Sequence, residues 1–171
     1  GGAVRMNAGA YGGEIKDIIV SAEVLDQNGD IHTLGKDELE LGYRTSCIMK
    51  YGYIVVSATL KLSKGNTDEI KENIKELSQK RRMKQPLEYP SAGSTFKRPE
   101  GYFAAKLIED AGLKGLSAGD AQVSEKHAGF VVNKGRATAK DVCELTDKIK
   151  EEVLKKSGVK LELEVVKIGE F

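Results

Sequence analysis

Ser94 stands among residue types that could give its hydroxyl a chemical role. It follows Gly93 in the stretch SAGSTFKRP, residues 91–99, and Lys97 and Arg98 come soon after it. A glycine permits a sharp turn that exposes the next side chain. Nearby cations would let the serine donate a proton toward an anionic ligand. A Gly/Ser loop with solvated charges explains the same residues equally well.

The sequence does not favour Ser94 as a nucleophile, and it predicts no metal site. A nucleophilic serine needs a basic partner, and neither His32 nor His127 gives a convincing Ser–His–acid spacing. The two cysteines, Cys47 and Cys143, have no Cys or His nearby at metal-ligand spacing. Both thiols are expected to be buried in a protein of the reducing cytoplasm.

Three other motifs could bind an anion or a cofactor. Glycines in NAGAYGGE, residues 7–14, would let backbone N–H groups approach a phosphate or a planar cofactor edge, although a generic tight turn explains them when taken alone. Arg44, in GYRTS, could bind a carboxylate through its guanidinium, with a surface ion pair as the default interpretation. Glu164, in the alternating stretch LELEV, indicates by itself only a solvent-facing residue.

The composition indicates a globular protein that binds neither nucleic acid nor membrane. Of 171 residues, 31% are charged and 40% hydrophobic, and the net charge of +1 creates no strong field that would attract nucleic acid. Apolar runs such as YIVV, at 53–56, are too short to span a bilayer. The glycine-rich start has no initiator Met and no signal-peptide pattern, so we expect a piece of a larger protein.

The periodicity predicts an α+β fold in two modules. The first, residues 1–64, is β-rich, and Asn28–Gly29 predicts a hairpin turn. Its strands are expected at 18–26, 31–34 and 53–62, with a short helical turn into a loop at 37–44. A linker helix is expected over 65–84, where the basic stretch KRRMK suits a helix C-terminus.

The second module is predicted to mix helices and strands over residues 85–160. Thr138 and Asp141 have capping-box spacing, and Gly158 is a helix stop. The elements are expected as a short helix at 101–112, a strand, break and strand within 121–133, a long helix at 138–158 and a closing strand at 160–168. The closing segment of the chain, residues 161–171, follows this second module.

Six motifs, taken in order along the chain, resemble one family closely. They are MNAGAYGGE, LGYRTS, QPLEYPSAGSTFKRP, AAKLIEDAGLKG, AQVSEKHAGFVVN and EVVKIGE. Together they resemble the MurB family of UDP-N-acetylenolpyruvoylglucosamine reductases, in its shorter, type II branch. The resemblance covers essentially the whole chain. It implies that residues 1–64 are the back half of a β-rich FAD-binding domain and that 85–160 form the MurB-type substrate-binding domain.

The resemblance implies an oxidoreductase of peptidoglycan synthesis, and hence of cell wall biogenesis, cell shape and cell division. NADPH would pass a hydride to FAD in this flavoprotein, and the hydride would then reduce the enolpyruvyl double bond of UDP-N-acetylglucosamine enolpyruvate. The product would be UDP-N-acetylmuramate. The family is expected to act in the cytoplasm, as a monomer when full length.

The resemblance also implies roles for individual residues. Ser94 would be the general acid that protonates C2 of the substrate, and Arg44 and Glu164 would stabilise the intermediate. The positions matching flavin contacts are Asn7, Gly9, Ala10, Tyr11 and Gly12, and those matching substrate contacts are Lys84, Arg98 and His127. Arg98 stands where the longer branch has an asparagine, and a structural role is the alternative for His127.

The matching motifs leave out the family's N-terminal domain and the first half of its second flavin-binding domain. We therefore expect this chain alone to bind FAD weakly or not at all, and to lack activity unless a second chain supplies the rest. A non-catalytic UDP-sugar binding module without flavin is the alternative function. A different FAD oxidase is disfavoured, because SAGSTFKRP and HAGFVVN belong to the substrate module.

Overall fold

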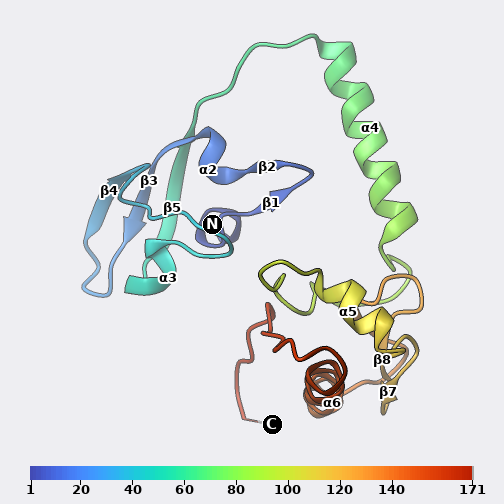
Figure 1. The fold of residues 1–171 in the computed structure, drawn as a ribbon. Coiled ribbons are helices and arrows are strands. Elements are labelled where there is room, and N and C mark those ends of the chain that lie inside the picture. The colour runs from blue at the N-terminus through green and yellow to red at the C-terminus, as the bar shows by residue number, and fades with distance from the viewer. Residues whose placement is uncertain (171) are drawn as a thin grey trace. The chain divides into compact units, whose positions relative to one another are not determined.

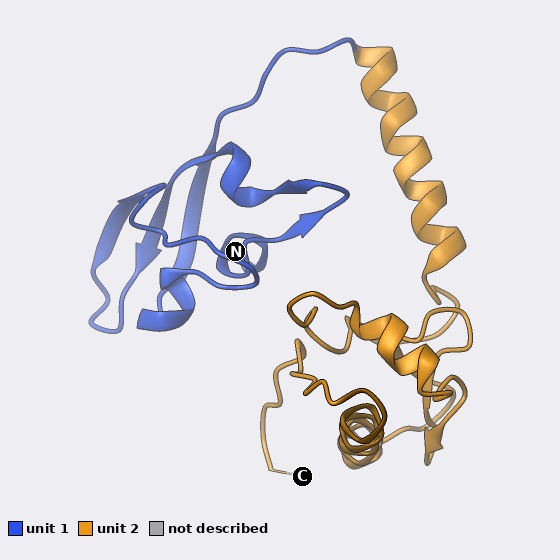
Figure 2. Cartoon of the chain, viewed as in Figure 1, with its two compact units in different colours: residues 1–66 blue, residues 67–171 orange. Residues whose placement is uncertain are grey.

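The computed structural model describes residues 1–170 and divides the chain into two compact units (Figure 2). Unit 1 spans residues 1–66 and unit 2 spans residues 67–171. Antiparallel sheets and helices occur in both units, which confirms the predicted α+β class. Phe171, the end of the predicted closing segment, lies outside the described residues.

Unit 1 is built on an antiparallel sheet whose strands lie in the order β4-β3-β5 (Figure 1). These strands are β3 (Ile19–Leu25), β4 (Ile31–Gly35) and β5 (Ile54–Leu60). The predicted hairpin joins β3 to β4, and Gly29 takes the positive φ of 92° that makes glycine suitable there. The buried apolar residues of this unit are Val4, Ile19, Ala22, Val24, Leu39, Cys47 and Ile48.

Short elements complete unit 1. They are α1 (Gly2–Arg5), the strand pair β1 (Gly9–Ala10) and β2 (Gly13–Glu14), α2 (Ile15–Ile18) and α3 (Cys47–Tyr51). The stretch 37–44, predicted as a short helical turn into a loop, forms hydrogen-bonded turns that lead into a loop. The Leu39 N–H donates to the Gly35 carbonyl oxygen at 3.1 Å, and the Glu40 N–H donates to the Asp37 carbonyl oxygen at 3.2 Å. Glu40 takes a left-handed φ of 46°, which ends any helical path, while Leu39 is fully buried.

Unit 2 contains an antiparallel sheet in the order β6-β9-β8-β7, with helices beside it. Its strands are β6 (Ser91–Ser94), β7 (Ser117–Ala118), β8 (Ala121–Val123) and β9 (Phe130–Asn133). Its helices are α4 (Thr67–Lys84), α5 (Ala104–Asp110) and α6 (Ala139–Ser157).

The core of unit 2 forms where α6 packs near the sheet and α5. Leu145, Ile149 and Val153 are each 0% exposed, as is Ile108 of α5. The predicted capping box is confirmed, since Thr138 and Asp141 exchange side-chain and backbone hydrogen bonds. The core therefore rests on a helix whose start is specified locally in the sequence.

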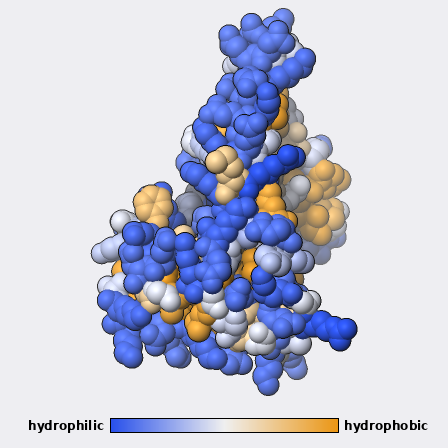
Figure 3. All heavy atoms as spheres, turned by 90° about the vertical axis from the view of Figure 1, so that its right-hand side faces the viewer, coloured by the Kyte–Doolittle hydropathy of each residue, from blue (hydrophilic) through white to orange (hydrophobic). Residues whose placement is uncertain are grey.

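Helix α4 buries none of its residues. Its apolar side chains are exposed to solvent, with Ile70 47% and Ile74 60% exposed. The face of the molecule that carries α4 is largely hydrophilic, with hydrophobic patches between the polar side chains (Figure 3). Acidic residues in the first turn of α4 and basic residues in its last turn stabilise it through the helix dipole.

The closing strand predicted over 160–168 is wrong within the described residues. One isolated bridge, between Phe96 and Leu163, replaces a continuous ladder. Strand pairing needs a long partner, and the partner here is the short segment 95–97, which soon reaches Pro99. Proline has no backbone N–H and fixes φ, so pairing cannot continue past it.

Asp26 gives unit 1 a stability that depends on pH. Its carboxylate contacts the His32 imidazole at 2.9 Å and accepts hydrogen bonds from the backbone N–H groups of Asp30 and Asn28. These contacts lower the pKa of Asp26 to about 2, and the hydrogen bond with His32 is the largest cause. Because the folded pKa is depressed, the stabilisation is complete above the ordinary pKa and is lost as pH falls through about 2.

We predict that Asp26→Asn lowers the urea midpoint of unit 1 at neutral pH, and that this loss shrinks as pH falls from about 4 to about 2. NMR signals of β3 and β4 amides would report the unfolding of this unit alone. An unchanged difference between the two proteins across that range would contradict the assignment.

Candidate functional site

In unit 1, the glycine-rich stretch and Arg44 border the same hollow, which has a volume of about 430 Å³. We call it the glycine hollow. The residues that line it are Gly9, Ala10, Gly12, Gly13, Glu14, Lys16, Asp17, Tyr43 and Arg44. The structure thus brings together one predicted catalytic residue and three of the five predicted cofactor contacts. Tyr11 is 57% exposed on the turn between β1 and β2.

Backbone conformation at the glycine hollow is unusual. Tyr11 and Gly12, at the turn of the β1–β2 pair, have φ values of 52° and 87°. Asn7 and Arg44 are also left-handed, with φ of 43° and 54°. Non-glycine residues rarely adopt this region, and they keep it only where the surroundings enforce it. The hollow is therefore shaped by turns that the rest of unit 1 must hold in place.

Asn7 helps to hold these turns in place. Its side chain is fully buried, and its amide nitrogen donates to Glu14 Oε2 at 2.8 Å and to the Gly42 carbonyl oxygen at 3.0 Å. Its amide oxygen accepts from the Lys16 backbone N–H at 2.9 Å. Asn7, predicted as a cofactor contact, thus turns its amide into the protein and links the glycine-rich stretch to the turn before Arg44.

Arg44 lies half-buried at the edge of the glycine hollow. Its Nη2 donates to the Gly9 carbonyl oxygen at 3.4 Å, and its guanidinium lies 5.1 Å from the centre of the Tyr43 ring. Glu14, on the same hollow, pairs with Lys16 at 2.9 Å. The hydrogen bonds from Lys16 and Asn7 lower the pKa of Glu14, so its carboxylate is ionised at neutral pH. The hollow therefore carries fixed charges of both signs.

In unit 2, Ser94 and Glu164 lie on neighbouring segments. Ser94 is the last residue of β6, opposite Phe130 of β9, and its side chain is exposed. A bulge precedes it, with Gly93 at a φ of 84°. The Glu164 backbone N–H donates to the Thr95 carbonyl oxygen at 2.9 Å. Glu164 is thus hydrogen-bonded to the residue that follows Ser94, although Ser94 and Glu164 are far apart in the sequence.

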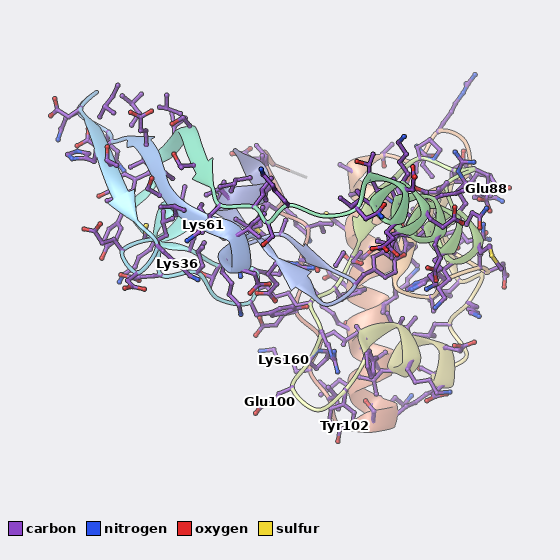
Figure 4. All side chains as sticks on the ribbon, turned by 90° about the horizontal axis from the view of Figure 1, so that it is seen from above. Lys36, Lys61, Glu88, Glu100, Tyr102 and Lys160 are labelled. Carbon is purple, nitrogen blue, oxygen red and sulfur yellow. The ribbon has the colours of Figure 1, made fainter. Side chains whose placement is uncertain are left out.

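Lys84 is exposed at the end of α4. Contacts of Lys126 with Arg82 and Glu88, which we call the clasp, hold this end of the helix. Lys126 Nζ donates to the Arg82 carbonyl oxygen at 2.9 Å and lies 3.5 Å from Glu88 Oε2. Glu88 lies beside α4 in Figure 4. The clasp connects the helix that ends in Lys84 to the loop that carries His127.

Arg98 is held on the loop before α5. Its guanidinium lies 3.9 Å from the centre of the Phe103 ring, and its Nε donates to the Tyr102 carbonyl oxygen at 3.3 Å. Tyr102 and Glu100 lie on this same loop in Figure 4. The stacking orients the guanidinium while its charge remains accessible.

His127 is partly buried and uncharged in this setting. Its Nδ1 accepts the Gly129 backbone N–H at 3.1 Å, and its ring packs edge-on to Phe130 at 5.0 Å. Burial, the largest cause, lowers the pKa of His127. Since Nδ1 accepts a hydrogen bond, the ring proton is assigned to Nε2, so His127 presents a neutral donor.

A second hollow, of about 320 Å³, lies against β6 and the end of α4. We call it the serine-strand hollow. Its lining comprises Arg81, Gln85, Pro86, Leu87, Tyr89, Pro90, Ser91, Gly93 and Phe130. Lys134 Nζ lies over the Tyr89 ring, 3.6 Å from the ring centre. Sequence reasoning did not single out Tyr89 or Phe130, and their only signal was their place in the motifs QPLEYP and HAGF.

Two further structural findings concern residues 1–170 only. No group of three or more His, Cys, Asp or Glu side chains in this range could hold a metal ion. None of the helices there combines the length and apolar composition that crossing a bilayer requires.

Comparison with known proteins decides the family. Residues 85–168 match the C-terminal domain of UDP-N-acetylenolpyruvoylglucosamine reductase. A protein of that name from Clostridium tetani is 61% identical over 170 residues, which are 99% of this chain and 55% of the relative. One from Agathobacter rectalis is 64% identical over 171 residues, which are 100% of this chain and 54% of the relative.

The chain matches the C-terminal portion of UDP-N-acetylenolpyruvoylglucosamine reductases. The crystal structure of the MurB reductase from Thermus caldophilus agrees, with a TM-score of 0.82 and 40% identity. That match covers 95% of this chain and 57% of the crystal structure's chain. The chain therefore spans about half the length of the MurB relatives it matches, and it carries their C-terminal domain.

We predict that Asn7→Gly lowers the free energy of unfolding of unit 1 by about 2 kcal/mol, because Glu14, Gly42 and Lys16 lose buried hydrogen-bond partners. Glycine tolerates the positive φ, so the substitution removes the side-chain contacts without adding backbone strain. Urea unfolding followed by β3 amide signals measures the change. Asn28→Gly, on the exposed hairpin turn, is the matched control and should shift stability by less than about 0.5 kcal/mol. Equal stability of the two variants would show that the hydrogen bonds of the Asn7 side chain do not stabilise unit 1.

Proposed function

We propose that this chain is the substrate-binding and flavin-edge part of a UDP-N-acetylenolpyruvoylglucosamine reductase. The reaction would reduce UDP-N-acetylglucosamine enolpyruvate to UDP-N-acetylmuramate with NADPH, through FAD. The observation that carries the proposal is the placement of Ser94 and Glu164 on hydrogen-bonded neighbouring segments of the matched domain. In the cell, this activity would serve peptidoglycan precursor synthesis in the cytoplasm.

The glycine hollow fits the edge of a flavin. At Gly12 and Gly13 a Cβ would meet no protein atom within 4 Å, so a side chain there would fill space that a planar ring could occupy. Gly9 and Ala10 add further lining, and Arg44 adds positive charge at the edge. Bound FAD would supply the hydride that it receives from NADPH. Residues 1–64 would hold this group, with Asn7 bracing the loop from behind.

Ser94 is proposed to hold and deliver a proton. Adding a hydride to C3 of the enolpyruvyl group leaves negative charge at C2 and on the substrate carboxylate. A hydroxyl that reaches C2 can quench that charge as a general acid. Ser94 suits this role because its side chain is exposed at the end of a strand, beyond a bulge whose glycine has a positive φ.

Charged residues would stabilise the developing charge and hold the substrate. The Arg44 guanidinium would bind the substrate carboxylate in a bidentate manner. Glu164 would stabilise the intermediate beside Ser94. Residues 85–160 would bind the UDP-sugar, with Lys84 and Arg98 meeting its negative groups and His127 donating from Nε2.

The test uses a chimera in which this chain replaces the 170 matched residues of the Clostridium tetani relative. We predict that Ser94→Ala leaves the rate of flavin reduction by NADPH unchanged. Reoxidation of the reduced flavin by substrate should slow about 100-fold or more, because the proton donor is lost. Stopped-flow absorbance separates the two half-reactions.

Ser117→Ala is the matched control, since Ser117 is an exposed strand serine whose hydroxyl donates to the nearby Gly115 carbonyl oxygen. It should leave both half-reactions as they are in the unsubstituted chimera. If Ser94→Ala also left both rates intact, Ser94 would not be the general acid.

A further inference from the structure

Thr95 makes hydrogen bonds through three separate groups to two segments of unit 2, residues 129–131 and Glu164. Its backbone N–H donates to the Gly129 carbonyl oxygen at 2.9 Å. Its carbonyl oxygen accepts the Glu164 N–H at 2.9 Å, and its hydroxyl accepts the Val131 N–H at 3.0 Å. The residue is only 3% exposed. Every one of these bonds therefore forms in a site that water hardly reaches.

The hydroxyl of Thr95 compensates for the bulge in β6. Pairing between β6 and β9 runs from Ser91 opposite Val132 to Ser94 opposite Phe130, so one extra residue lies on β6 between these pairs. Such a bulge disrupts the ladder locally and leaves a strand N–H in need of an acceptor. The Thr95 side chain supplies that acceptor to Val131. The bulge before Ser94 is thus accompanied by a hydroxyl acceptor one residue after Ser94.

The same residue holds the segment that carries Glu164. Besides the Thr95 bond, this segment contacts residues 96 and 97 through the backbone. The Lys97 N–H donates to the Glu162 carbonyl oxygen at 2.8 Å, and Phe96 and Leu163 form an isolated bridge. A shift of Thr95 would therefore displace Ser94, through the peptide bond, and Glu164, through the hydrogen bond.

We propose that Thr95 is a positioning residue, whose buried hydroxyl keeps Ser94 and Glu164 in one fixed arrangement. The inference rests on the proposed function, in which these two residues act on the same substrate. Thr95 does not touch the substrate in this account. Its effect is on orientation, which is why small displacements at such a residue can change rates by orders of magnitude.

Valine and serine substitutions separate the hydroxyl from the shape of the side chain. Thr95→Val keeps the branched shape and removes the acceptor, whereas Thr95→Ser keeps the acceptor and removes a methyl group. Thr146→Val is the matched control, because Thr146 is 1% exposed and its hydroxyl bonds only locally, to the Cys143 carbonyl oxygen at 2.9 Å.

The first measurement is amide hydrogen exchange of this chain, without any ligand. We expect the Glu164 N–H to exchange about ten-fold faster in Thr95→Val than in the unsubstituted chain, because its acceptor is no longer held. Thr95→Ser and Thr146→Val should exchange at that amide as the unsubstituted chain does. Unchanged exchange at Glu164 in Thr95→Val overturns the proposal, whatever reaction the protein performs.

The second measurement uses the chimera with the Clostridium tetani relative. We expect Thr95→Val to slow flavin reoxidation by saturating substrate about ten-fold, with flavin reduction by NADPH unchanged and rescue by Thr95→Ser. Equal slowing of both half-reactions, or an equal defect in Thr95→Ser and Thr95→Val, overturns the proposal. No reoxidation by substrate in the flavin-loaded, unsubstituted chimera would instead refute the proposed function, while the exchange data still decide whether Thr95 holds Glu164.

Discussion

The hydrogen bond from the Glu164 N–H to the Thr95 carbonyl oxygen is the contact on which the candidate site of unit 2 depends. It joins the end of the chain to the loop that follows Ser94. Around it, Leu161 is buried, but Val166 and Ile168 are 67% and 85% exposed. The segment is thus anchored at its start and at Glu164, and little beyond that point fixes it.

Both units hold their candidate residues in the same physical way. An exposed or half-exposed candidate residue has an unfavourable backbone conformation or lies beside a residue that has one. A buried polar side chain nearby then forms hydrogen bonds with the backbone groups that this conformation leaves unpaired. Asn7 does this for the glycine-rich stretch and the turn of Arg44, and Thr95 does it for Ser94. Buried hydrogen bonds suit this task because leaving their partners unpaired is costly.

What the sequence predicted correctly was specified by neighbouring residues. Asn28–Gly29 marks its hairpin and Thr138–Asp141 its helix start, because the side chains that define each feature lie within a few positions. The prediction of a closing strand was wrong, because the alternation in LELEV cannot show whether a partner strand is present. The buried hydrogen bonds of Asn7 and Thr95 could not be predicted from the sequence, because each residue bonds to a segment more than thirty residues away.

The most direct test is steady-state turnover by the chimera of this chain with the Clostridium tetani relative. The assay would follow NADPH oxidation at 340 nm and detect the product by mass spectrometry. The account predicts NADPH oxidation that requires UDP-N-acetylglucosamine enolpyruvate and yields a product heavier by two hydrogens. A folded, flavin-loaded chimera that oxidised no NADPH in response to this substrate, beside an active parent enzyme, would contradict it.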